Sequence, residues 1–234
     1  MRRVTETLVA TYRTNDWIAD LLPTPAVTAG LLMDRWLVDS LPKRAIFAAL
    51  YGDLLRPEAT DLGRRVLDVG GGISALTAQL ARNSDYSVLD LLAHDGHTAV
   101  SGLEVEVGRR VLLRDDWYGS LATLPPYDIL IANDLFPNVD QRLELFLDRA
   151  LPRSREVRLS LTFYNSPRFY MCKRVDADEL MCLLAWSGGQ TSMALRRYAD
   201  RIVNADFTVF DNHHNSVFPN GRHVVLVTLQ GMRP

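Results

Sequence analysis

Apolar residues recur every three or four positions through the first sixty residues, which is the spacing of one face of a helix. Pro23 ends the first such run. Thr24-Pro25 suits the start of a second helix, because a hydroxyl caps free N–H groups and proline lacks one. The pattern predicts three helices, which cover 4–22, the residues from 24 to just before Pro42, and Ala45–Leu55.

From Arg64 onward the pattern changes to short runs rich in β-branched and apolar residues, separated by helical stretches. These runs predict strands over 66–69, 86–90, 111–113, 127–132 and 157–163. Strands that alternate with helices are typical of a parallel sheet covered by helices on both faces.

The last sixty residues break this alternation. Two helices are predicted between Asp176 and Asn204, with Ser187-Gly188-Gly189 between them, followed by strands over 207–210 and 223–229. No helix separates those two strands, so we expect them to be antiparallel to each other. A parallel sheet that ends in an antiparallel strand differs from the symmetric doubled form of a dinucleotide-binding domain.

Composition and charge narrow the class of protein. The 234 residues include 26 basic and 28 acidic side chains, a balance that argues against a nucleic-acid partner. Cys172 and Cys182 are too few for a disulfide framework or a four-thiolate metal site. The opening MRRVTETL lacks the apolar run of a secretory signal, and no apolar stretch reaches the roughly 18 residues of a membrane helix. We therefore expect a cytoplasmic protein with no membrane partner.

A glycine-rich turn, Gly70-Gly71-Gly72, follows the first predicted strand, and with Ala75 it matches the dinucleotide pattern G-x-G-x-x-A. Asp68, two residues before the first glycine, argues against a dinucleotide because its charge would repel a pyrophosphate at this turn. An acid at that position suits a cationic ligand. S-adenosylmethionine carries an ammonium and a sulfonium and has no phosphate.

The segment LDVGGG resembles the first motif of class I S-adenosylmethionine-dependent methyltransferases, with Ser74 in place of the usual third glycine. The resemblance continues through roughly 64–151. It implies that Asp68, Gly70, Gly71 and Gly72 hold the aminoacyl end of the cofactor.

The family's later motifs follow in order. The resemblance implies that Asp90, followed by Leu91, binds the ribose hydroxyls and that Asp116 accepts from the adenine amino group, with Trp117 against a ring face. In the fourth motif, PYDILIAND, it places Asn133 and Asp134 beside the reactive methyl group.

The run VLDL, then DDW, then FPNVDQRLELFLDRAL, is most similar to the O-methyltransferases of plant and bacterial secondary metabolism, in which a histidine at the start of that helix is the general base. Pro137 or a neighbour stands there in this chain, so that base is not carried over. The open candidates for the base are His213, His214 and Asp134.

Other polar and aromatic groups admit two interpretations. His94-Asp95-Gly96-His97 contains good metal ligands, but a solvated loop is favoured and no metal is predicted. The aromatic stretch 163–170, with Arg168 inside it, fits an acceptor wall or a packed loop equally well. Trp36, Tyr51 and Trp186 are expected in the core or on the inner face of a helical cover.

The patterns predict an α/β chain, and the resemblance implies the Rossmann-like class I methyltransferase fold, a mostly parallel seven-stranded sheet with one antiparallel strand. Residues 1–60 would form a helical N-terminal cap segment, 61–234 the S-adenosylmethionine-binding domain, and the helix pair over 176–204 a second cover. The predicted activity is methyl transfer to a small-molecule acceptor, with an oxygen nucleophile favoured over nitrogen. A nicotinamide-dependent oxidoreductase, a non-catalytic binding protein and every oligomeric state stay open.

Overall fold

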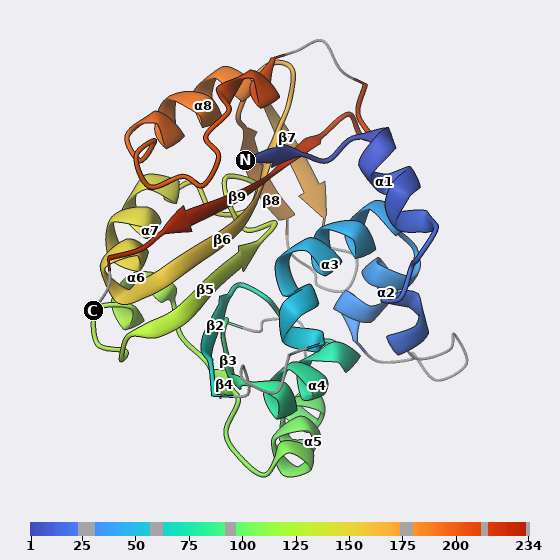
Figure 1. The fold of residues 1–234 in the computed structure, drawn as a ribbon, viewed down its shortest axis with the longest axis vertical. Coiled ribbons are helices and arrows are strands. Elements are labelled where there is room, and N and C mark those ends of the chain that lie inside the picture. The colour runs from blue at the N-terminus through green and yellow to red at the C-terminus, as the bar shows by residue number, and fades with distance from the viewer. Residues whose placement is uncertain (23–30, 57–62, 92–96, 174–179, 212–214, 233–234) are drawn as a thin grey trace.

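A seven-stranded sheet forms the centre of the computed structural model, which describes residues 1–22, 31–56, 63–91, 97–173, 180–211 and 215–232. The strand order is β1-β9-β6-β5-β2-β3-β4 (Figure 1). The strands are β1 (Arg2–Arg3), β2 (Arg65–Val69), β3 (Asp85–Leu89), β4 (Leu112–Leu113), β5 (Tyr127–Asn133), β6 (Ser154–Phe163) and β9 (His223–Gln230). Neighbours from β4 to β6 pair in parallel, whereas β9 is antiparallel to both β6 and β1. The predicted sheet with one antiparallel strand is confirmed.

The edge of the sheet beside β9 differs from the prediction. The expected strand over 207–210 was wrong, because these residues form a 3₁₀ helix, η4 (Phe207–Phe210). Asp206 tightens this turn by accepting from both the backbone N–H and the hydroxyl of Thr208, at 3.0 and 2.6 Å. The edge position belongs instead to β1, whose Arg3 pairs in register with Val225. A segment from the far end of the chain therefore completes the sheet.

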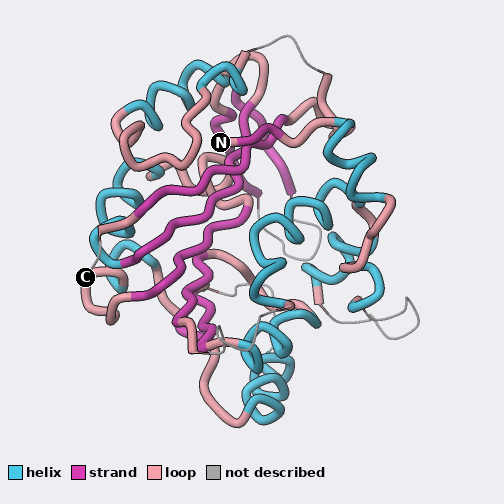
Figure 2. Tube along the Cα trace, viewed as in Figure 1, coloured by secondary structure: helices cyan, strands magenta, loops and turns pink. Residues whose placement is uncertain are grey.

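Helices cover the sheet in two layers (Figures 1 and 2). One layer contains α1 (Glu6–Arg13), α2 (Leu32–Val38), α3 (Leu41–Leu55), α4 (Ala75–Asn83) and α5 (His97–Val107). The other contains α6 (Trp117–Ser120), α7 (Leu143–Ala150) and α8 (Gly188–Arg196). Short 3₁₀ turns, η1 (Ala19–Leu21) and η3 (Leu151–Arg153), complete the connections. Each layer packs on its own cluster of buried apolar side chains, one on each face of the sheet.

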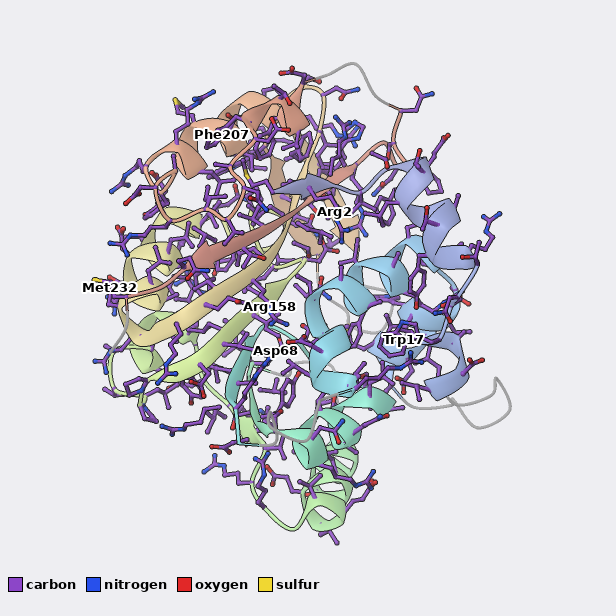
Figure 3. All side chains as sticks on the ribbon, viewed as in Figure 1. Arg2, Trp17, Asp68, Arg158, Phe207 and Met232 are labelled. Carbon is purple, nitrogen blue, oxygen red and sulfur yellow. The ribbon has the colours of Figure 1, made fainter. Side chains whose placement is uncertain are left out.

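The strand β6 shows how side-chain alternation sorts the two faces. Its apolar side chains belong to the cluster under α7 and α8, and they are Val157, Leu159, Leu161 and Phe163. The intervening residues are Arg158, Ser160 and Thr162, which are polar. Arg158 reaches α3, where it donates to the carbonyl of Leu50 at 2.7 Å and pairs with Asp53 (Figure 3). The α3 face of the sheet is therefore polar where it meets β6.

The N-terminal segments are helical as predicted, but the helices begin and end at other residues than predicted. The helix α1 is shorter than predicted and starts at the cap Thr5. The helix α3 starts earlier than predicted, at Leu41, because the Ser40 hydroxyl accepts from the backbone N–H of Lys43 and Pro42 fits the first turn. Thr24-Pro25 lies outside the described residues. No helix in the described part of the chain is long and apolar enough to cross a membrane.

The first helix of the predicted C-terminal pair was wrong. In its place β7 (Arg168–Lys173) and β8 (Leu180–Ala185) form an antiparallel two-stranded sheet. Six consecutive residues of LMCLLA fit a buried strand as well as a helix, so periodicity alone does not separate the two. The Asp176 signal lies outside the described residues. The second helix is confirmed as α8, which Ser187 begins as an N-cap in a capping box with Gln190.

Candidate functional site

The glycine turn between β2 and α4 lies at the carboxyl edge of the parallel strands. Gly70 and Gly72 have φ of +70° and +60°, a region that side chains with a Cβ rarely adopt. Gly71 is required for another reason, since a Cβ there would lie 2.3 Å from the carboxyl carbon of Asp68. The Gly70 N–H donates to Leu89 on β3 at 2.9 Å, which fixes the turn to the sheet. All three glycines are thus dictated by the local geometry.

Asp68 is buried between the sheet and α3 (Figure 3). Its Oδ2 accepts two hydrogen bonds, from the hydroxyl of Tyr51 on α3 at 2.8 Å and from that of Tyr86 on β3 at 2.6 Å. Its Oδ1 is buried and has no hydrogen-bond partner among the described residues. Burial raises the pKa of this carboxyl to about 7, against the lowering effect of the two tyrosines. A buried oxygen of this kind calls for a donor from a bound molecule.

Two further acids surround the turn. Asp90 accepts from the Gly72 N–H at 3.0 Å, and the buried Asp34 of α2 accepts from the Ala75 N–H at 2.8 Å. Ser74 caps the next N–H of α4, so the donors at the start of this helix are occupied. A pyrophosphate would need those donors and would meet three carboxylates. A cationic group fits the turn instead. Sequence reasoning missed Asp34, which lies 41 residues from the group it caps.

The residues expected at the adenine are engaged with each other and with the protein. Asp116 caps α6 by accepting from the Tyr118 N–H at 2.8 Å, and it pairs with Arg142 at 3.0 Å. The hydrogen bonds from Arg142 lower the pKa of Asp116. Trp117 is buried, donates to Asp140 at 2.8 Å and has the Arg142 guanidinium 4.6 Å from its ring centre. Leu91, by contrast, is exposed.

Asn133 and Asp134 end β5 as the fourth motif implies. Asp134 has φ of +57°, and its Oδ1 accepts from the Thr162 hydroxyl at 2.7 Å and from the Asn138 amide at 3.3 Å. Its Oδ2 forms an ion pair with the buried Arg222 at 2.7 Å. Asn133 accepts from the Ser160 hydroxyl at 2.7 Å. Arg222 lies 88 residues from Asp134, and sequence reasoning missed it.

Lys43, in the first turn of α3, lies close to this ion pair. Its ammonium nitrogen is 4.4 Å from the ring centre of Trp36, and the side chain is half-buried. Burial lowers the pKa of Lys43, and the charge of Arg222 lowers it further, whereas Asp134 and Asp39 raise it. Trp36 was expected in the core or on the inner face of a cover, yet it is 42% exposed.

The described part of the chain contains one buried histidine that sequence reasoning missed, His223 at the start of β9. Its Nδ1 lies 2.6 Å from the guanidinium of Arg3, and its Nε2 lies 2.9 Å from the side-chain oxygen of Asn165. Arginine can only donate, so Nδ1 accepts and Nε2–H donates, which makes this imidazole neutral. His213 and His214 lie outside the described residues, as do His94 and Asp95.

The β7–β8 hairpin lies against the loop that follows β5. The Tyr170 hydroxyl donates to Asn138 at 3.2 Å, and the Gln141 amide donates to the carbonyl of Leu184 at 3.1 Å. Arg168 stacks 4.3 Å from the ring centre of Tyr164. The aromatic stretch over 163–170 therefore leads into a strand beside the fourth motif, where a pair of helices had been predicted as the cover.

Comparisons with known proteins give matches among solved structures. No family model matches the chain, and no curated protein matches it in sequence. The N-terminal domain of EvdMO1 with SAH bound is 16% identical, with 94% of this chain and 97% of that one covered and a TM-score of 0.54. The same domain in the presence of SAH and D-fucose gives 16% identity, coverage of 80% and 82%, and a TM-score of 0.51.

A further match is the 1,6-didemethyltoxoflavin-N1-methyltransferase of Burkholderia thailandensis with bound 1,6-didemethyltoxoflavin and S-adenosylhomocysteine. It is 17% identical, with 91% of this chain and 92% of that one covered and a TM-score of 0.45. The resemblance to class I S-adenosylmethionine-dependent methyltransferases is confirmed at the level of the fold, which this chain shares with a domain that binds SAH.

Proposed function

We propose that this chain is a class I S-adenosylmethionine-dependent methyltransferase that acts on a small hydroxylated acceptor. The observation that carries this proposal is the buried Oδ1 of Asp68, which has no hydrogen-bond partner among the described residues and lies beneath a glycine turn ringed by carboxylates. That arrangement suits the ammonium of the cofactor and rejects the phosphates of a dinucleotide.

Each part of the cofactor has a candidate partner at the same sheet edge. Asp68 and the three glycines would hold the aminoacyl end, and Asp90, which already orders the turn through Gly72, would hold the ribose. Leu91 would lie beside the ribose after Asp90, and Asp116 would border the adenine, shared between its amino group and Arg142. When bound, the cofactor supplies a methyl group on a sulfonium, which the enzyme must chiefly align with the acceptor.

Trp117 fits a supporting role in this proposal. Its ring is packed against Phe136 and Phe146, at centroid distances of 5.8 and 5.4 Å, and under Arg142. It would therefore support the adenine site from beneath by holding Arg142 and the start of α6, while Asn133 would lie beside the methyl group.

The acceptor region lies where β5, β6 and β9 meet. The side chains gathered there are hydrogen-bonding or charged, among them Thr162, Asp134, Arg222 and Lys43. Such a lining suits a hydroxylated molecule, because a buried polar group without a partner is costly. The EvdMO1 domain was crystallised in the presence of D-fucose, a hydroxylated sugar, which supports oxygen as the acceptor atom.

The test is a calorimetric titration of the purified protein with S-adenosylhomocysteine and, in parallel, with NADH. We expect micromolar binding of S-adenosylhomocysteine and none of NADH. Preference for NADH would refute the assignment of the turn. Tight binding of S-adenosylhomocysteine without methylation of any member of an acceptor panel would instead indicate a binding protein that kept the fold.

A further inference from the structure

The chain uses lysine very sparingly. Of its 26 basic residues only Lys43 and Lys173 are lysines, and the other 24 are arginines. Arginine stays charged in proteins, whereas a lysine placed in a desolvated site gives up its proton readily. A lysine at a functional site of this arginine-rich chain therefore indicates a role for a side chain that can lose its proton, which arginine cannot do.

Lys43 occupies such a site. It stands in the first turn of α3, with the ring centre of Trp36 from α2 4.4 Å from its ammonium nitrogen. The charges of Asp134 and Arg222, the ion pair at the ends of β5 and β9, act on this ammonium group. Among the described residues its Nζ donates no hydrogen bond and contacts the ring of Trp36. A structural lysine normally has a carboxylate or carbonyl partner, so this one is left with its polar atom available to a ligand.

The charges that face Lys43 come from three directions. Arg222 precedes β9 and opposes a second positive charge, Asp134 follows β5, and Asp39 ends α2. Asp134 is already paired with Arg222, and together with burial this leaves a lowered pKa for Lys43. A proton acceptor that works near neutral pH needs a lowered pKa of this kind.

The other described candidates for this role are less suitable. Both oxygens of Asp134 accept hydrogen bonds, and one of them is paired with the guanidinium of Arg222. Both ring nitrogens of His223 are engaged, with Arg3 on one side and Asn165 on the other. Neither group presents a lone pair toward an acceptor molecule without first breaking a contact.

We propose that Lys43 takes the proton from the acceptor hydroxyl during methyl transfer. The inference rests on the proposed function. The hydroxyl proton passes to the lone pair of the Lys43 amine as the acceptor oxygen forms its bond to the methyl carbon. The electron pair of the broken methyl–sulfur bond stays on sulfur, so the positive charge of the sulfonium reappears on the Lys43 ammonium. Asp134 and Asp39 stabilise that charge until the proton leaves to solvent.

The small number of lysines gives a direct test. Protein grown with [ε-¹³C]lysine should show two side-chain resonances, and the K173R variant assigns them by removing one. With the protein saturated with S-adenosylhomocysteine, we expect the Lys43 resonance to titrate at a lower pH than that of Lys173, because burial lowers the pKa of Lys43. Titration of both near the ordinary value of about 10.4 would overturn the proposal.

A kinetic assay distinguishes a role of Lys43 in proton transfer from a role that needs only its positive charge. Wild type, K43R, K43M and K173R are assayed for S-adenosylhomocysteine release with a panel of phenol, catechol and D-fucose. Because a general base contributes about 100- to 10,000-fold, we expect kcat to fall by at least about 100-fold in both Lys43 variants, with K173R unchanged. The acidic limb of the pH–rate profile should disappear with Lys43.

Two outcomes of the kinetic assay would also overturn the proposal. Retention of kcat in K43R would show that only the positive charge matters, as in binding of an anionic acceptor. Loss of S-adenosylhomocysteine affinity in K43R equal to the loss of rate would show a structural role. A wild-type protein that binds no S-adenosylhomocysteine would refute the proposed function instead, while the NMR titration would still report on Lys43 by itself.

Discussion

The buried carboxyl of Asp68 leads to an unusual prediction, namely that removing its charge stabilises the ligand-free protein. Its pKa rises from 3.8 to about 7, because burial penalises the ionised form. A rise of about three pH units corresponds to roughly 4 kcal/mol of free energy. The raised pKa means that the folded state binds this proton more tightly than the unfolded chain, so the group's contribution to stability is lost as the pH rises from about 4 through 7.

Asp68→Asn should recover part of that loss at pH 8.5. The amide oxygen can still accept from Tyr51 and Tyr86, but the amide nitrogen takes the place of the unpartnered Oδ1 and costs about 1–3 kcal/mol. We therefore expect the free energy of unfolding of the variant to exceed that of wild type by about 1–3 kcal/mol at pH 8.5. At pH 5, where the folded wild type is protonated, this advantage should disappear.

Urea denaturation at the two pH values measures this difference, and calorimetry with S-adenosylhomocysteine measures the cost to binding. The variant should bind S-adenosylhomocysteine at least about tenfold more weakly, because an amide replaces the charge that faces the ammonium. Two results would contradict the reasoning: a variant less stable than wild type at pH 8.5, or a difference from wild type that is the same at both pH values. Either would show that burial does not make ionisation of Asp68 costly in the folded protein.

Two further substitutions test the same turn. Asp90→Ala should reduce S-adenosylhomocysteine affinity by about 1.5–3 kcal/mol in calorimetry, because it removes a charged hydrogen-bond acceptor. Asp85→Ala, an exposed acid at the opposite end of the same strand, is the matched control, and equal effects of the two would contradict the ribose assignment. Gly71→Ala should lower the free energy of unfolding in urea by about 1–3 kcal/mol, since its Cβ displaces the Asp68 carboxyl. Gly102→Ala, where a Cβ meets open space, should not destabilise the protein, and a similar loss there would remove the steric explanation.

Local sequence pattern predicted the strands of the parallel sheet well, because each combines β-branched residues with a clear break on either side. The local pattern gave a wrong prediction where contacts with residues distant in the chain decide the structure. The run 207–210 has strand composition, yet Asp206 curls it into a turn and Arg3 donates to the carbonyls of Val209 and Asp211 at 3.4 and 2.9 Å. The run 180–185 pairs with residues 168–173, and no local signal in the sequence indicates that partner.

The residues of the candidate site also fall into those that local motifs predicted and those that come from distant parts of the chain. Asp68, the glycines and Asp90 belong to contiguous motifs, so their proximity followed from the order of the strands. The tyrosines that hold Asp68 come from a helix and a neighbouring strand, 17 and 18 residues away in the chain. Tyr51 was expected to pack in the core, and it does. A buried tyrosine needs a partner for its hydroxyl, and that requirement was the signal available in the sequence.

The helix α3 has a consequence for how the two halves of the reaction stay aligned. Lys43 and Tyr51 lie eight residues apart on it, a separation of about 12 Å along a rigid axis. Lys43 is the proposed proton acceptor, and Tyr51 donates to the Asp68 carboxylate under the glycine turn. If Lys43 takes the proton and Asp68 binds the cofactor as proposed, the distance between these two functions is set by a single helix rather than by the loops around it. Arg158 of β6 attaches α3 to the sheet through polar contacts with Leu50 and Asp53. A displacement of α3 across β6 would therefore move Lys43 and Tyr51 by the same amount.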